Sequence, residues 1–168
     1  MSSKTCRMSC GRLRAVAEID SPYLNFAVIC EKVLQEADGV LSFIRLIDHL
    51  TVTMTIPAGA DVPQEAVPPE PPVVVTFALG LKSPSDIGPV PVKVRIETPS
   101  GLSLPEFETS QPVGAEDRGI NIVLPMQFPA QDEGVYWFAV EVSGTVITRI
   151  PLRISKQIVP QDMPPQAQ

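Results

Sequence analysis

The sequence predicts an all-β protein, an antiparallel β-sandwich of seven to eight strands. Nineteen Pro and ten Gly are spread over 168 residues, which argues against long helices and favours short strands joined by turns. Residues 50–56 (LTVTMTI) alternate apolar residues and Thr without a break, as in a strand with one buried face. Hydrophobic residues make up 44% of the chain, enough to supply the two inner faces of a sandwich.

Strand-like stretches follow one another along the chain and are separated by turn signals. The first stretch, YLNFAVIC, is nearly all apolar and suits a buried strand, and Asp38-Gly39 marks a turn after it. VPVKVRIE alternates with Val and Ile inward, and its outward Pro91 suggests an edge or a strand start. We expect about eight strands, at residues 23–30, 40–47, 50–56, 73–81, 90–97 and 120–128 and in the two arms of the final hairpin.

Other segments lack strand periodicity. Residues 31–37 suit one helical turn or a loop. Residues 57–72 contain six Pro in sixteen positions and predict an extended loop. Residues 102–118 are acidic and resemble a loop. We therefore divide the chain into a basic flexible tail (1–20), the sandwich (21–156) and a Pro-rich C-terminal tail (157–168).

The final hairpin must bring two apolar faces into agreement. Directly opposed residues share a face, and a two-residue loop at Ser143-Gly144 would pair Phe138 with Arg149. A three-residue loop, Val142-Ser143-Gly144, pairs Phe138 with Thr148 and restores the agreement. It also places Gly144 where a G1 bulge needs a positive φ. We expect the three-residue loop.

The entry to this hairpin carries a spacing with a structural meaning. Asp132, Gly134, Tyr136 and Phe138 form the pattern Asp-x-Gly-x-Tyr-x-buried residue. This pattern is typical of the tyrosine corner of immunoglobulin-like sandwiches, in which the Tyr hydroxyl bonds to upstream backbone. Phe138 stands where an antibody domain carries its second Cys. The alternative is a plain turn before a plain strand. The pattern favours an immunoglobulin-like sandwich, although a fibronectin-like or C2-like strand order fits equally well.

Three stretches resemble a known family. FAVICEKVLQEADGVLSFIRLID, VKVRIETPSG and EGVYWFAVEVSGTVITRIPLRI resemble the opening, middle and closing strands of a family of uncharacterised bacterial proteins with an immunoglobulin-like domain. The resemblance covers nearly all of 23–154. It implies the fold and a bacterial origin, and it implies no activity. The basic leader and the long loop at 57–72 depart from the family pattern.

Charge and cysteine content exclude several classes of protein. The net charge is -6, and four of the 13 basic residues lie in the first 14 positions, so the rest of the chain is still more acidic. Such a body is unsuited to nucleic acid or to an anionic membrane. No apolar run matches a secretory signal or a membrane span. Three Cys make no disulfide framework. We expect a cytoplasmic protein.

No motif indicates catalysis or a cofactor. Cys6, Cys10, Cys30 and His49 are conceivable zinc ligands, but we expect a core Cys30 and two incidental tail thiols. Asp48-His49 offers a base without a nucleophile motif beside it. The acidic pairs Glu106/Glu108, Glu116/Asp117 and Asp132/Glu133 lack the spacing of a calcium loop and suit solvated loops. We expect no enzyme activity, no metal and no cofactor.

One group of residues suggests an interface. Trp137, Ile147 and Arg149 lie on the predicted outward phase of the final hairpin, and exposed Trp and Arg are enriched in interfaces. The alternative is that another segment covers them. The Pro-rich loop is a second candidate ligand surface. No residue assigns a specific function. We expect a non-enzymatic protein-interaction domain that acts through a sheet face or edge, by partner binding or self-association. The alternatives are a structural subunit of a phage-derived or other assembly, and a hydrolase or metal protein with an unrecognised site.

Overall fold

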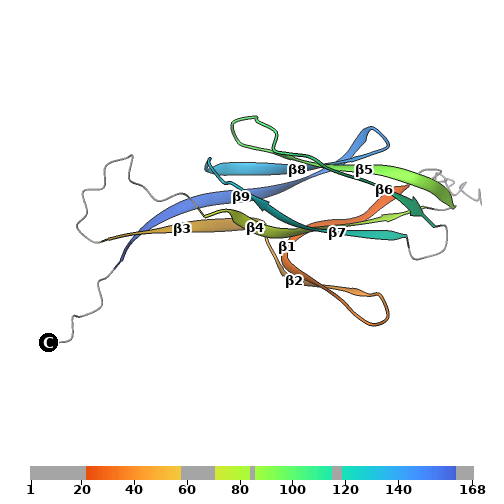
Figure 1. The fold of residues 1–168 in the computed structure, drawn as a ribbon, viewed down its shortest axis with the longest axis horizontal. Coiled ribbons are helices and arrows are strands. Elements are labelled where there is room, and N and C mark those ends of the chain that lie inside the picture. Colours follow the sequence, from red (N-terminus) through yellow and green to blue (C-terminus); the bar gives the residue numbers. More distant parts are fainter. Residues whose placement is uncertain (1–21, 58–70, 84–85, 115–118, 162–168) are drawn as a thin grey trace, which may run out of the picture.

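The computed structural model describes residues 22–57, 71–83, 86–114 and 119–161, and every element within them is a strand. Two sheets pack face to face (Figure 1), with strand orders β2-β1-β4-β7 and β3-β9-β8-β5-β6. The all-β sandwich predicted from sequence is confirmed. The strands are β1 Tyr23–Gln35, β2 Leu41–Leu46, β3 His49–Pro57, β4 Val73–Lys82, β5 Ile87–Glu97, β6 Phe107–Val113, β7 Ile120–Phe128, β8 Gly134–Val142 and β9 Thr145–Gln161.

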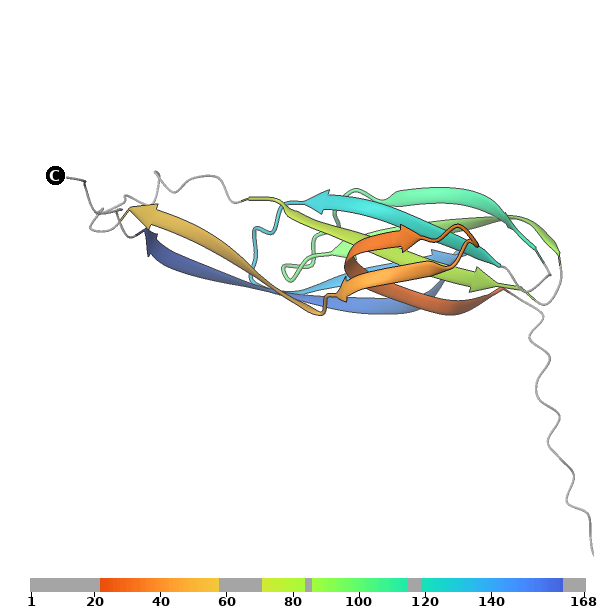
Figure 2. The same ribbon diagram turned by 90° about the horizontal axis from the view of Figure 1, so that it is seen from below.

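The four-stranded sheet is antiparallel and carries a folded-back hairpin. β1 pairs with β4 up to Cys30 and with β2 from Cys30 onward. Figures 1 and 2 show the β1–β2 hairpin lying across the outer face of this sheet. Phe26 lies between this sheet and the hairpin. Its ring meets the Phe43 ring edge-on at 5.2 Å and packs on Gly80, where it leaves no room for a Cβ. Gly80 therefore permits the close approach of the hairpin.

The five-stranded sheet contains one parallel pair, where the sequence predicted only antiparallel strands. β3 runs parallel to β9 from His49↔Arg153 to Pro57↔Gln161, and the other pairs are antiparallel. β8 pairs with β9 only as far as Ile154, so the last part of β9 has β3 as its ladder partner. Figure 2 shows β3 and β9 extending together beyond the rest of the sandwich.

Aromatic stacking joins the two sheets at the centre of the core. Phe77 of β4 and Phe138 of β8 are both fully buried and stack with ring centroids 5.7 Å apart and planes 8° apart. The order β5-β8-β9 opposite β1-β4-β7 matches the C-F-G and A-B-E strands of an immunoglobulin domain. Phe77 and Phe138 thus lie on the strands that an antibody domain joins by its disulfide. Packing replaces the covalent link.

The tyrosine corner is confirmed. Tyr136 is fully buried, and its hydroxyl donates to the Asp132 carbonyl oxygen at 3.0 Å and accepts from the Asp132 N–H at 3.2 Å. Ser100 Oγ donates to the Asp132 carboxylate at 2.7 Å. Gly134 has φ 138°, and a Cβ there would lie 3.0 Å from the Pro99 ring. Only Gly suits this position.

The hairpin prediction was wrong in loop length and right at Gly144. Val142 pairs with Thr145, is buried and stays in β8, so the loop has two residues. Ser143 and Gly144 have φ of 50° and 81°, as a type I′ turn requires. A register shift after Val140 pairs Glu141 with Val146 and Val140 with Thr148. The extra residue at this bulge, and not a longer loop, brings the apolar residues of the two strands onto the same face.

Three predicted boundaries also change. β1 continues to Gln35, where we expected a helical turn or loop. β6 lies inside the segment predicted as a loop and brings the count within the described residues to nine strands. β9 continues to Gln161, past the predicted domain end at 156. Each of these strand segments is edge or projecting structure, where one-sided pairing leaves little hydrophobic pattern to detect. The tail 1–20 and the loop 57–72, except Pro57 and residues 71–72, lie outside the described residues.

Candidate interaction surface

The outer face of the five-stranded sheet presents Trp137 to solvent. Trp137 is 40% exposed and points away from the core, between Glu97 on β5 and Pro151 on β9 in the pairing register. β8 places it there because its neighbours in sequence, Tyr136 and Phe138, are fully buried on the opposite face. Exposure of a large aromatic ring on the central strand of a sheet is typical of a contact surface.

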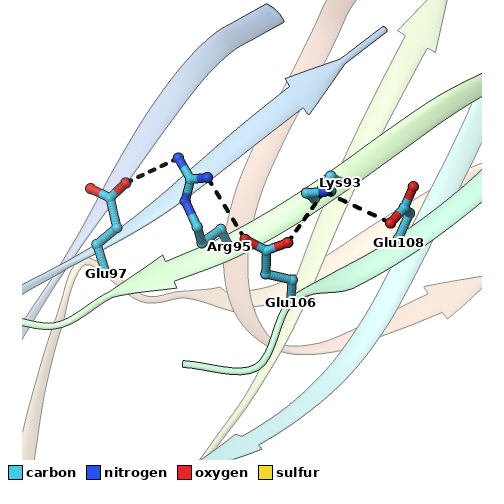
Figure 3. Close-up of polar contacts among 5 residues, drawn as sticks. All are labelled: Lys93, Arg95, Glu97, Glu106 and Glu108. Atoms are coloured by element: carbon cyan, nitrogen blue, oxygen red, sulfur yellow. Dashed lines mark hydrogen bonds and ion pairs between the residues drawn. The ribbon is translucent and has the colours of Figure 1, made fainter. Parts of the chain in front are cut away.

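An ordered array of charges lies beside Trp137 on this face, and Figure 3 shows its centre. Arg95 reaches Glu97 at 3.4 Å and Glu106 at 3.7 Å. Lys93 reaches Glu106 at 3.3 Å and Glu108 at 3.8 Å. Glu106 therefore links two cations of β5.

The array continues onto β9 and shields part of the sheet. Arg149 lies 3.7 Å from the second oxygen of Glu97. Ala139 lies on the outer face with Arg95 and Arg149 as its register partners on either side, yet it is only 2% exposed. The long aliphatic stems of Arg cover apolar surface in this way. The ion pairs hold the guanidinium groups of Arg95 and Arg149 against this face, beside Trp137.

Electrostatics around Lys93 are dominated by acids. A hydrogen bond from Lys93 to Glu106 and the Glu106 charge raise the pKa of Lys93 above its ordinary value of 10.5, and Glu108 and Glu141 act in the same direction. Lys93 therefore stays charged through the physiological range. Since its charge is already neutralised by neighbours, it is not free to attract a phosphate.

Two of the three predicted interface residues lie on this surface. Trp137 and Arg149 are exposed on it. Ile147 is not part of it, because the bulge turns it so that it is half-buried and packs against the core. Pro151 and the β5–β6 charges were missed. The alternation of Lys93 and Arg95 on β5 was readable in the sequence, but their carboxylate partners follow from a β5–β6 pairing that no local pattern reveals.

The four conceivable zinc ligands are not brought together within the described residues. Cys6 and Cys10 lie outside them. Cys30 is buried under the hairpin, and this burial raises the pKa of its thiol. His49 Nε2 lies 2.9 Å from Ser155 Oγ across the parallel pair. No group of three or more His, Cys, Asp or Glu side chains suited to a metal occurs in the part of the chain that the structure describes.

The acidic residues singled out in the sequence form ion pairs and hydrogen bonds within the fold wherever the structure describes them. Glu106 and Glu108 take part in the charge array, and Asp132 belongs to the tyrosine corner. The Glu133 carboxylate accepts a hydrogen bond from the backbone N–H of Lys156. Glu116 and Asp117 lie outside the described residues.

A groove of about 460 Å³ opens between the two sheets along β6 and β7. Its walls are mostly apolar, and Glu106 is the one titratable residue among them. The lining residues are Ile96, Leu104, Pro105, Glu106, Phe107, Leu124, Pro125, Met126, Gln127, Phe128 and Pro129. The groove has no nucleophile–base pair, and it lies away from Trp137. Within the described residues, no helix is long and apolar enough to cross a membrane.

Comparison with known proteins gives a family and similar solved structures. The chain matches no curated protein. It is similar to a crystal structure of an immunoglobulin-like protein from Pseudomonas aeruginosa, with 12% identity, a TM-score of 0.38, and coverage of 80% of this chain and 97% of the other. Residues 25–155 match the model of a family of unknown function, DUF6941. The chain therefore belongs to this family of unknown function.

Proposed function

We propose that this domain is a non-enzymatic protein-binding module that works through the outer face of its five-stranded sheet. The observation that carries the proposal is Trp137, a 40% exposed ring on a central strand, beside side chains already fixed by ion pairs. Ordered side chains lose little conformational entropy on binding, which favours affinity.

The charges of this face indicate the kind of partner. Four basic and four acidic residues lie on it: Lys93, Arg95, Arg149, Arg153, Glu97, Glu106, Glu108 and Glu141. Balanced charge suits a protein surface better than the uniform negative charge of nucleic acid or an anionic membrane. We propose a protein partner that inserts an apolar side chain against Trp137 and Pro151, and we keep the cytoplasm as the proposed location.

The chain contains a built-in probe for this contact. Trp137 is its only tryptophan, so intrinsic fluorescence reports this surface alone. Partners recovered by affinity capture with the wild-type protein should shift Trp137 emission to shorter wavelength and protect it from acrylamide. Trp137→Ala should lower recovery of the same partners by about tenfold or more, because central aromatic anchors carry much of the binding energy.

The matched control is Val74→Ala, which removes a 67% exposed apolar side chain from β4 in the other sheet and should leave recovery unchanged. Equal recovery by wild type and Trp137→Ala, or partners that leave the emission unchanged, would contradict the proposed surface.

The hydrolase alternative has one specific observation in its favour, the 2.9 Å contact between His49 Nε2 and Ser155 Oγ. Both residues lie in regular strands of a parallel ladder, and within the described residues no carboxylate bonds to the His49 ring to orient it, as a triad needs. We propose a structural cross-strand hydrogen bond. Labelling of the wild type, but not of Ser155→Ala, by a fluorophosphonate probe would overturn the non-enzymatic proposal.

A further inference from the structure

β3 forms an edge of the five-stranded sheet with features that edge strands normally avoid. Its nine residues pair with β9 on one side, and no described strand pairs with its other side. From Leu50 to Ile56 it carries no charge, no Pro and no register shift. Natural sheets block exposed edges with charges, Pro or bulges, because unpaired N–H and C=O groups otherwise recruit another strand.

The other described edges carry such features. β6 contains Pro112 and Glu108, β7 contains Pro125, and β2 contains Arg45 with a φ of 52°. β9 is blocked on its open side at Lys156, whose backbone N–H donates to the Glu133 carboxylate. β1 before Cys30 also has an open side, but a register shift between Leu24 and Phe26 interrupts it. β3 is thus the unprotected edge in the described part of the molecule.

The position of β3 increases its need for another strand. Beyond Ile154 of β9 the sheet narrows to the parallel pair β3–β9, which extends past the sandwich (Figure 2). Two-stranded sheets are marginal in water, and parallel pairs are ordinarily covered on their faces and flanked by further strands. A third strand against β3 would complete its hydrogen bonding and widen this ribbon.

The sequence of β3 is complementary to itself. In an antiparallel pair centred on Thr53, Thr51 stands opposite Thr55 and Val52 opposite Met54. Leu50 then stands opposite Ile56, so apolar residues meet apolar residues and Thr meets Thr. Cross-strand Thr pairs and aliphatic pairs both stabilise antiparallel sheets, and no like charges meet between 50 and 56. Thr51 and Thr53 are exposed and Met54 is half-exposed, so these side chains are available.

We propose that two copies of this chain associate through β3, antiparallel about a two-fold axis at Thr53, to form a continuous ten-stranded sheet. Such a contact is isologous and closes at the dimer. The axis is perpendicular to the sheet, so both Trp137 surfaces lie on the same side of it. The contact does not depend on the interaction surface proposed above, because β9 separates β3 from Trp137 on β8.

Sedimentation of the full chain over a broad concentration range tests the dimer. We expect the mass to rise from 18.2 kDa toward twice that value. Added salt should strengthen the dimer, because each chain carries a charge of -6 and β3 itself needs no ion pair. Trp137 emission should not change as the dimer forms. A wild type that stays monomeric at every concentration would overturn the proposal.

Charge at the axis supplies the specific test. Thr53→Lys puts two like charges opposite each other and should weaken the dimer by at least about tenfold. Thr53→Asp should do the same, and an equimolar mixture of the two variants should recover the dimer. Ser110→Lys, at an exposed position of the β6 edge, is the matched control and should dimerise like the wild type. Circular dichroism checks that each variant is folded.

Two outcomes would assign self-association elsewhere and overturn the β3 contact. One is a Thr53→Lys protein that dimerises like the wild type. The other is a mixture of the Lys and Asp variants that shows no recovery although both are folded. Loss of the dimer in Trp137→Ala with Thr53→Lys unaffected would point instead to the sheet face.

Discussion

The two edges of the five-stranded sheet differ in how they are protected. β6 lies beside β5, and its end carries Glu106 and Glu108, both paired with Lys93. β3 lies beside β9 in a parallel ladder, and its central residues are Thr and apolar. One edge is charged and interrupted by Pro112, and the other is regular and neutral. Since one edge is protected and the other is open, we infer that the open edge pairs with another strand.

The two edges also differ in what stabilises them. β6 pairs with β5, and β5 pairs with β8, which carries Phe138 of the Phe77–Phe138 stack. β6 is therefore connected to the centre of the core through β5. The outer half of β3 depends on β9 alone among the described strands. Local opening should therefore begin at β3, whereas β6 should open only with the core.

The largest expected effect comes from removing the centre that both edges share. Phe138→Ala deletes a fully buried ring stacked on Phe77 and should lower the free energy of unfolding by about 3–5 kcal/mol. Chemical denaturation measures this loss, and amide exchange should speed up in β6, which opens with the core, more than in the outer half of β3. Val146→Ala, at an exposed position of β9, should change little. A loss below about 1 kcal/mol for Phe138→Ala would show that the stack is not the centre of the fold.

A smaller loss is expected at the tyrosine corner. Tyr136→Phe removes the hydroxyl that bonds twice to the backbone of Asp132 and should cost about 1–2 kcal/mol. Tyr23→Phe is the matched control, because Tyr23 is 38% exposed on β1. A melting curve of Tyr136→Phe that overlays the wild type would argue against a stabilising role for the corner.

Truncation of the C-terminus should distinguish the two edges directly. Ending the chain after Lys156 removes the residues that pair with Thr53–Pro57. Amides in this part of β3 should then exchange freely, while those of β6 keep their protection and global stability falls by less than in Tyr136→Phe. The dimer proposed above should also weaken. Uniform loss of protection in both edges would show that the ribbon and the core unfold as one unit.

The smallest effect concerns the charge array at the β6 edge. The folded state raises the pKa of Lys93 above 10.5, so the folded state holds this proton more tightly than the unfolded chain does. The Lys93 interaction is therefore fully present below about pH 10.5 and is lost as the pH rises through the folded-state pKa. Unfolding curves of wild type and Lys93→Met should differ slightly near pH 9 at low salt and converge at higher pH. A difference that grows with pH would contradict this sign.

The sequence was informative wherever a pattern was local and two-sided. Tyr136, Gly134 and Phe138 could be assigned because a turn, a buried ring and an alternating strand coincide within a few residues. Met54 and its neighbours showed the strand by alternation. The partner of β3 could not be predicted, since pairing with β9 depends on the arrangement of the whole chain. Ile147 was misplaced because a bulge shifts the phase of a strand by one residue, and alternation alone cannot locate the shift.

The pairing of β3 with β9 has a consequence for the order of assembly during synthesis. β3 leaves the ribosome early, but its partner is made roughly 100 residues later, and contacts of such separation form slowly. Until β9 emerges, the neutral, threonine-rich strand has no ladder to join. The nascent chain therefore carries this strand without its ladder partner while about 100 further residues are made, and neighbouring ribosomes on one message would bring such strands together.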